Sequence, residues 1–310
     1  MQALAERQAV DRATFERDLL PAAQPVVLRG LVSDWPAVAL AQRSPTALLQ
    51  ELAGLDSGRD VDALMLPPGQ GQRIFYNADG SGFNYLRNRL PLTRVAEQLQ
   101  RYAQFADPPA VAVQSAPVAD CAPGLLIGHT MPLLDATVAP RLWLGNAIVT
   151  PTHFDESHNI ACVVAGRRRF TLFAPEQVGN LYVGPLGHAP TGTPISLVDL
   201  NAPDFDRYPR FADALAAARS AVLEPGDAIY IPPLWWHHVQ SLQPINLLLN
   251  YWWNPAGADS GLDALQQAMH SFGALPPAQR KAWQAMFAHW VFEADAGTQA
   301  HIPPTMRRPV

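Results

Sequence analysis

The feature that most constrains the fold is a succession of short strand-like segments between residues 141 and 253. Residues 141–150, 159–165, 167–173, 221–223, 228–231 and 245–253 are rich in Val, Ile, Phe, Tyr and Trp, and Gly or Pro residues separate them. Gly166 stands where a tight hairpin turn would join two of these segments. Because no helical pattern alternates with the segments, we expect a mainly β fold of the antiparallel sandwich or jelly-roll type.

Helical patterns flank this β-rich region on both sides. Toward the N-terminus, the apolar spacing predicts helices at residues 13–20, 45–52 and 92–102, with short strands at 25–31, 61–66, 73–76 and 110–114. After Pro255, two apolar stripes with helical spacing occur at residues 262–269 and 283–290. A length of 310 residues favours one large domain or two. We therefore expect a β-rich domain with an N-terminal elaboration over residues 1–255 and a helical region over residues 256–310.

Composition excludes several classes of protein. The chain is 48% hydrophobic and 16% charged, which argues against disorder. It contains no apolar run near the roughly 18 residues of a membrane span and no signal-peptide pattern at its start, so we expect no membrane partner. A net charge of −5 without a basic tract argues against a nucleic-acid partner. Two cysteines form neither a disulfide framework nor a four-thiolate zinc site, which favours the cytoplasm.

Two distant motifs contain candidate metal ligands. The segment TPTHFDESHN places His153 two residues before Asp155, so both side chains share one face if the chain is extended there. The segment GDAIYIPPLWWHHVQSL places His237 and His238 among prolines and large aromatic residues. Taken singly, His153 and Asp155 also fit a solvent-exposed pair in a loop, and His237 and His238 also fit buried histidines of the core. Together, two histidines and one carboxylate match the facial triad of non-haem Fe(II) oxygenases, although zinc hydrolases can share such ligands.

Arg168, in GRRRFTLF, is the third candidate. In a strand it shares a face with Phe170 and Leu172, whereas Arg167 and Arg169 point the other way. If the apolar face points into the barrel, a guanidinium is buried there, and a buried cation needs an anion. That anion is either a carboxylate of the barrel, in a structural salt bridge, or the distal carboxylate of a co-substrate held by two hydrogen bonds.

The joint motif resembles the JmjC and cupin-like 2-oxoglutarate oxygenases. The resemblance rests on LGNAIVTPTHFDESHNIACVVAGRRRFTLFAPEQ, PGDAIYIPPLWWHHVQSL and NLLLNYWW, and PVVLRGLVSDWP and FYNADGSGFNYL also look like this family. It covers about residues 24–255. The most similar type is the subgroup that includes the asparaginyl hydroxylase acting on hypoxia-inducible factor. The resemblance implies a double-stranded β-helix core, with Fe(II) as cofactor and 2-oxoglutarate as co-substrate.

Carried over position by position, the resemblance makes His153, Asp155 and His237 the Fe(II) ligands, and His238 a neighbour pointing away. The implied co-substrate residues are Arg168, Thr150, Asn159, Asn250 and Trp252. Two departures concern the co-substrate. Arg168 replaces the usual lysine, and residues 111–114 contain no tyrosine where such hydroxylases place a phenol.

These features predict an Fe(II)- and 2-oxoglutarate-dependent dioxygenase that uses dioxygen to hydroxylate a C–H bond, by resemblance in a peptide side chain. The alternatives are a small-molecule hydroxylase, a metal-binding cupin-like module without oxygenase activity, and a metal-dependent isomerase or hydrolase on the same barrel. Five tryptophans are expected to form an apolar shell around the site: Trp143, Trp235, Trp236, Trp252 and Trp253. The similar hydroxylase dimerises through C-terminal helices, so we expect a homodimer formed by residues 259–294, whose stripes also fit packing within the chain.

Overall fold

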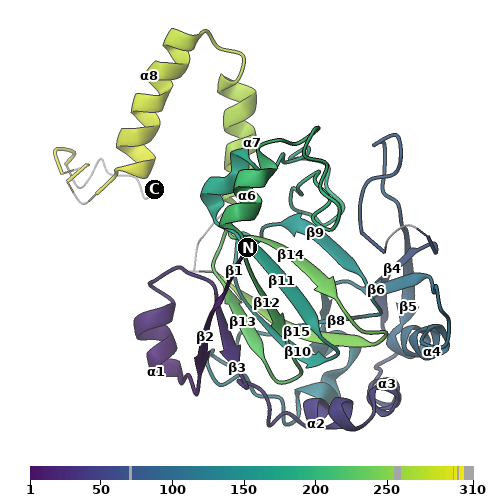
Figure 1. Ribbon diagram of the computed structural model, residues 1–310. Coiled ribbons are helices and arrows are strands. Elements are labelled where there is room, and N and C mark those ends of the chain that lie inside the picture. The colour runs from purple at the N-terminus through teal and green to yellow at the C-terminus, as the bar shows by residue number, and fades with distance from the viewer. Residues whose placement is uncertain (70–71, 255–259, 296, 299, 304–310) are drawn as a thin grey trace. The chain divides into compact units, whose positions relative to one another are not determined.

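The strands between residues 140 and 253 form two facing sheets in a computed structural model, which describes residues 1–69, 72–254, 260–295, 297–298 and 300–303 (Figure 1). The chain divides into two compact units, residues 1–258 and 259–310. The boundary expected between residues 255 and 256 lies outside the described residues.

The first unit carries the strands and most of the helices. Its strands are β1 (Gln2–Ala3), β2 (Ala5–Gln8), β3 (Val26–Arg29), β4 (Asp60–Leu66), β5 (Leu86–Pro91), β6 (Ala110–Val113), β7 (Ala116–Pro117), β8 (Pro140–Gly145), β9 (Val149–His153), β10 (His158–Ala165), β11 (Arg168–Phe173), β12 (Arg219–Leu223), β13 (Ala228–Ile231), β14 (Trp236–Ser241) and β15 (Asn246–Trp253). Its helical segments are α1 (Arg12–Thr14), η1 (Phe15–Leu19), α2 (Pro36–Arg43), α3 (Pro45–Gly54), α4 (Leu92–Tyr102), α5 (Val118–Cys121), η2 (Pro123–Leu126), η3 (Pro175–Gly179) and α6 (Phe211–Ala217).

The two sheets form a mainly antiparallel sandwich, as the strand pattern predicted. The smaller sheet has the order β1-β12-β11-β14-β9, and the larger runs β2-β3-β13-β10-β15-β8-β6-β4-β5, with β7 paired to β8. Alternate side chains of β10 point to opposite faces of the larger sheet. Ala161 and Val163 pack between the sheets with Phe170 of β11, whereas Ile160 and Cys162 belong to the core on the opposite face of the larger sheet.

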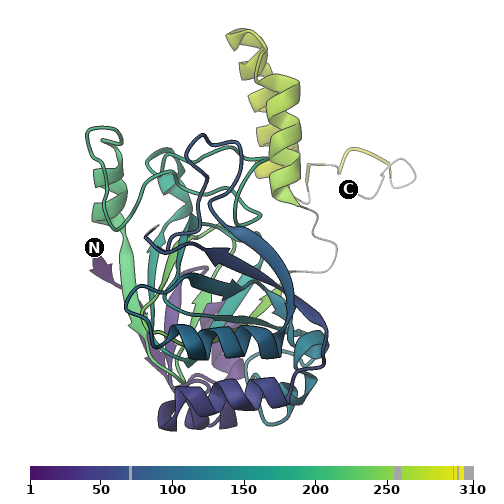
Figure 2. The same ribbon diagram turned by 90° about the vertical axis from the view of Figure 1, so that its right-hand side faces the viewer.

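Helices α2, α3 and α4 cover that opposite face of the larger sheet (Figures 1 and 2). Helix α3 begins as expected, because the Ser44 hydroxyl accepts a hydrogen bond from the Ala47 amide and Pro45 occupies the first helical position. Helix α4 spans the predicted residues and buries Val95 and Leu99 in the core.

Two predicted strands differ from the structure. Residues 141–150 were expected to be one strand, but β8 ends at Gly145 and β9 begins at Val149. The break lies at Asn146, whose side chain accepts from the Val111 amide and donates to the Pro109 carbonyl. Residues 73–76 form isolated bridges, at Arg73 and Tyr76, instead of a strand. The break matters because β9, freed from β8, joins the smaller sheet and carries a ligand there.

The second unit contains α7 (Gly261–Phe272), α8 (Pro277–Phe287) and η4 (Ala288–Phe292). Phe272 packs against Trp283 with ring centroids 4.6 Å apart, but no residue of the three elements is buried. Large apolar side chains therefore stay exposed, among them Met269, Met286 and Trp290. Among the described residues, the structure has no helix with the length and apolarity that crossing a membrane requires.

Candidate metal centre

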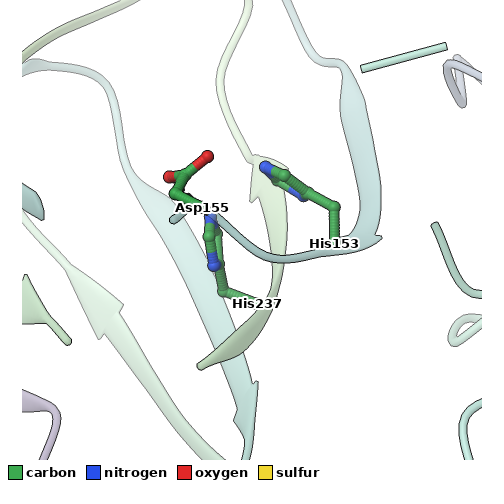
Figure 3. Close-up of side chains that lie close together, drawn as sticks. All are labelled: His153, Asp155 and His237. Atoms are coloured by element: carbon green, nitrogen blue, oxygen red, sulfur yellow. Dashed lines mark ion pairs between the residues drawn. The ribbon is translucent and has the colours of Figure 1, made fainter. Parts of the chain in front are cut away.

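Strand pairing brings the two candidate histidines side by side. His153 is the last residue of β9, and His237 is directly opposite it on β14. Their rings lie 4.2 Å apart between centroids. Asp155 follows β9 by two residues and turns toward both imidazoles (Figure 3). One ligand atom from each residue lies within 4.8 Å of the others, an arrangement that can hold one metal ion.

Backbone carbonyls fix both imidazoles in the form that binds a metal. His153 Nδ1 lies 2.8 Å from the Pro151 carbonyl oxygen, and His237 Nδ1 lies 3.0 Å from that of Trp235. A carbonyl only accepts, so each Nδ1 carries a hydrogen, which leaves Nε2 as the ring nitrogen that can bind a metal. Burial, followed by the neighbouring His237, holds the pKa of His153 well below its ordinary range. His153 is therefore neutral near pH 7, as metal ligation requires.

A chain of hydrogen bonds orients the carboxylate of Asp155. Its Oδ2 accepts from Trp252 Nε1 at 3.2 Å and from Asn159 Nδ2 at 3.3 Å. The side-chain oxygen Oδ1 of Asn159 accepts from Asn250 Nδ2 at 3.3 Å, and Oδ1 of Asn250 accepts from Trp143 Nε1 at 2.7 Å. These donors orient the carboxylate beside His237, whose Nε2 lies 3.5 Å from Oδ2, and they tie it to β10, β15 and β8.

The residues proposed from the sequence line one small cavity of about 60 Å³. They are Thr150, His153, Asp155, Asn159, Arg168, His237, Asn250 and Trp252, and Trp143 and Phe170 add apolar wall. The roles assigned to them by resemblance stay predictions. Larger hollows, among them two of about 620 and 570 Å³, lie elsewhere, and the described residues place no such set of ligands in those two.

Arg168 lines this cavity and has no ion-pair partner among the residues that the structure describes. It lies on β11 on the same side as Phe170, and only 8% of it is exposed. Burial lowers its pKa to about 10, so it remains charged near neutrality. Within the described part of the chain, no carboxylate lies within 4.0 Å of it and its Nε has no hydrogen-bond partner. The structural salt bridge considered from the sequence therefore has no acid to form it.

Some of the tryptophans and histidines singled out from the sequence line the cavity, and others are buried away from it. Of the five tryptophans expected to form the shell, Trp143 and Trp252 line the cavity. Trp235 instead packs in the core between the sheets, and its indole donates to the Ala23 carbonyl. His238 is buried outside the ligand group, and neither ring nitrogen has a partner among the described residues. The polar role of Trp143 was missed, because the sequence does not show which indole meets an amide.

Comparisons with known proteins agree with this geometry. A family model described as "Cupin-like domain" matches residues 12–259. Lysine-specific demethylase JMJ31 of Arabidopsis thaliana is 35% identical over 115 residues, 36% of this chain and 20% of the relative. Jumonji C domain-containing protein 5 of Drosophila melanogaster is 36% identical over 114 residues, 36% and 27% of the two chains. tRNA wybutosine-synthesizing protein 5 of Danio rerio is 30% identical over 146 residues, 42% of each. The chain thus spans less than half the length of these relatives.

Proposed function

The chain belongs to the family of cupin-like domains, and from that premise we propose that it is an Fe(II)- and 2-oxoglutarate-dependent dioxygenase. It hydroxylates a C–H bond in a protein or peptide side chain. The chemistry follows from the cavity, and the peptide substrate from the resemblance to the asparaginyl hydroxylase subgroup.

One observation carries the proposal: a partnerless, buried guanidinium lies in the same cavity as a three-residue metal-binding group. Arg168 lacks an anion among the described residues, and a small dicarboxylate that also binds the metal would supply one. The ligand group fits Fe(II), since two imidazoles and one carboxylate are the ligand set of non-haem Fe(II) oxygenases and would leave room on the metal for a co-substrate.

The chain's own residues bind, orient and exclude water. His153 and His237 would hold the metal through Nε2, and Asp155 would hold it through its carboxylate. Arg168 pairs with the distal carboxylate of 2-oxoglutarate, assisted by the hydroxyl of Thr150. When bound, iron with 2-oxoglutarate and dioxygen supplies the oxidation, in which one oxygen atom enters the substrate and the other enters succinate as carbon dioxide leaves.

The amides and indoles have a separate part in the proposal. Asn159 and Asn250 face the co-substrate while holding the ligand carboxylate in place. Trp143 and Trp252 keep the cavity apolar, which limits the access of water to the reacting atoms. The names of the relatives, a lysine-specific demethylase and a tRNA wybutosine-synthesizing protein among them, point to different substrates. They support the chemistry and leave the substrate to experiment.

Anaerobic reconstitution tests the proposal directly. Fe(II) and 2-oxoglutarate added together should give the weak visible charge-transfer band of their chelate, and dioxygen should then yield succinate. Arg168→Gln should raise the 2-oxoglutarate concentration needed for the band. Arg169→Gln is the matched control, because the neighbouring Arg169 points outward to Gln240. Metal binding without the band would favour a metal-binding module instead, and a band with an unchanged 2-oxoglutarate dependence in Arg168→Gln would assign the carboxylate to another residue.

A further inference from the structure

A second arginine, Arg141, contacts the ring of a residue that lines the metal cavity and itself lines the separate hollow of about 620 Å³. Its guanidinium carbon lies 5.9 Å from the centroid of the Trp252 ring, and Trp252 lines the metal cavity. Arg141 itself lines the larger hollow. A residue of the larger hollow is therefore in contact with the wall of the metal cavity.

The register of β8 explains this position. Arg141 is opposite Asn250 on β15 and two residues before Trp143, so the three side chains share one face of the sheet. Asn250 and Trp143 both line the metal cavity. Leu142, which alternates with them, is buried in the core on the other face. The face that carries the proposed co-substrate residues thus ends in a cation.

Ser115 holds this cation in a fixed orientation. The Nε of Arg141 donates to the Ser115 hydroxyl at 2.6 Å and lies 3.1 Å from its carbonyl oxygen. Ser115 has a φ of +50°, a left-handed conformation that residues other than glycine rarely adopt. With Nε occupied, the two terminal nitrogens remain available to form a pair of parallel hydrogen bonds with a carboxylate or phosphate.

The other arginines around the hollow are already paired. Arg59 lies 2.8 Å from a carboxylate oxygen of Asp120, and Arg89 lies 4.0 Å from one of Asp62. No acid of the described chain lies within 4.0 Å of Arg141. Arg141 is thus the arginine of this hollow that lacks a carboxylate partner among the described residues.

We propose that Arg141 binds an anionic group of the substrate, a carboxylate or a phosphate, while the C–H bond to be oxidised lies at the metal. This inference rests on the proposed function and adds the substrate class to it. The path from Asp155 through the Trp252 indole to Arg141 is on the order of 10 Å, the length of about three residues of extended chain. The peptide therefore carries its acidic or phosphorylated residue within about three positions of the modified residue.

The test measures charge selection in binding, separately from turnover. The full chain is loaded with Zn(II) and 2-oxoglutarate, immobilised, and offered pools of randomised nonapeptides. One pool carries a fixed Glu, one a fixed phosphoserine, and the matched pools carry Gln or Ser there. The wild type should retain anionic peptides about tenfold over their neutral partners, as a charged hydrogen-bonded pair predicts. The ratio of phosphoserine to Glu enrichment identifies the source of the anion.

Three variants assign the selection to a residue. Arg141→Gln should abolish the enrichment, and Arg141→Glu should reverse it toward a pool with a fixed Lys. Arg59→Gln removes a paired arginine from the same hollow and should leave the enrichment unchanged. Arg141→Lys, which keeps the charge without the Nε contact, should restore part of it and guards against a loss caused by misfolding.

The outcomes separate this inference from the proposed function. Equal retention of anionic and neutral peptides by the wild type, or selection that survives in Arg141→Gln, overturns the role of Arg141. Arg141-dependent selection in a protein that makes no succinate supports that role and refutes the oxygenase activity.

Discussion

Replacing Trp252 with Phe removes a single hydrogen bond from the proposed metal ligand. The indole Nε1 donates to Asp155 Oδ2 at 3.2 Å, while its ring packs edge to face against Trp143 at 5.8 Å. Phenylalanine keeps an aromatic ring at this position but has no donor. The change therefore tests whether the hydrogen bond, as distinct from the apolar wall, prepares the carboxylate for the metal.

The expected size of the effect follows from the surroundings of Asp155. Hydrogen bonds to charged groups contribute about 1.5–3 kcal/mol. The bond here is long, Asn159 still donates to the same oxygen, and the Asp155 side chain is 18% exposed, so water can replace part of what is lost. We expect a loss near the lower limit, about 1.4 kcal/mol, which corresponds to about tenfold weaker metal binding.

Competition with a chromophoric chelator, using Zn(II) and, without oxygen, Fe(II), measures the dissociation constant directly. Trp35→Phe is the matched control, because it removes an indole donor 3.1 Å from the Thr130 carbonyl, in the helical core away from the ligands. That variant should lose stability and keep its metal affinity. Metal binding by Trp252→Phe equal to that of the wild type would refute the idea that Trp252 positions Asp155.

Three further predictions concern the scaffold. Burial holds the pKa of His129 below its ordinary value of about 6.5, and its Nε2 accepts a backbone N–H. The unfolded chain therefore binds the proton first as the pH falls, so stability is lost below about pH 6.5, and His129→Gln should flatten that loss in urea unfolding. Gly166→Ala should cost about 2 kcal/mol or more, because φ is +72° and the new Cβ meets the Ile245 carbonyl at 2.6 Å, whereas Gly192→Ala, at φ +87° with open space, should cost only the backbone strain. Light scattering should give a dimer that Trp290→Asp converts to a monomer, since this side chain is 41% exposed on an apolar helical unit.

Each of these three has a result that contradicts it. An unaltered pH profile in His129→Gln would mean that other groups govern acid stability. Equal losses in the two glycine variants would mean that the close approach at Gly166 relaxes without cost. A wild-type monomer at micromolar concentration would end the proposal of a homodimer through the C-terminal helices.

Local patterns were enough to predict most of the strands and helices. Helix α4 and strand β13 have the predicted bounds, and Gly166, with φ +72°, forms the turn expected between β10 and β11. The failure at residues 146–148 has a long-range cause. The Cβ of any other residue at Gly145 would meet the Val111 carbonyl oxygen at 2.5 Å, and Asn146 bonds to residues before β6 and on it. A break that depends on contacts more than thirty residues away leaves no periodic signal.

In the site as well, residues within motifs could be predicted from the sequence, whereas a residue placed by tertiary contacts could not. The resemblance to the JmjC and cupin-like oxygenases implied that His237 rather than His238 would join His153, and the ligand group has this composition. The sequence also grouped Arg168 with Phe170 and Leu172 on one face of a strand, and the structure shows that this face is buried. By contrast, Arg141 has no motif around it. Its position depends on strand register with Asn250 and on the conformation of Ser115, and the local sequence predicts neither of them.

Because Arg168 has no acid partner among the described residues, the free energy of unfolding depends on whether an anion occupies the cavity. A protein that carries a lone cation in its interior is less stable empty than filled, by the free energy with which a suitable anion binds. Thermal melting in the presence of different dicarboxylates would then rank them as occupants without any turnover. A cell short of the right dicarboxylate would hold a larger unfolded fraction of this protein, so the supply of a small metabolite would set how much of it survives.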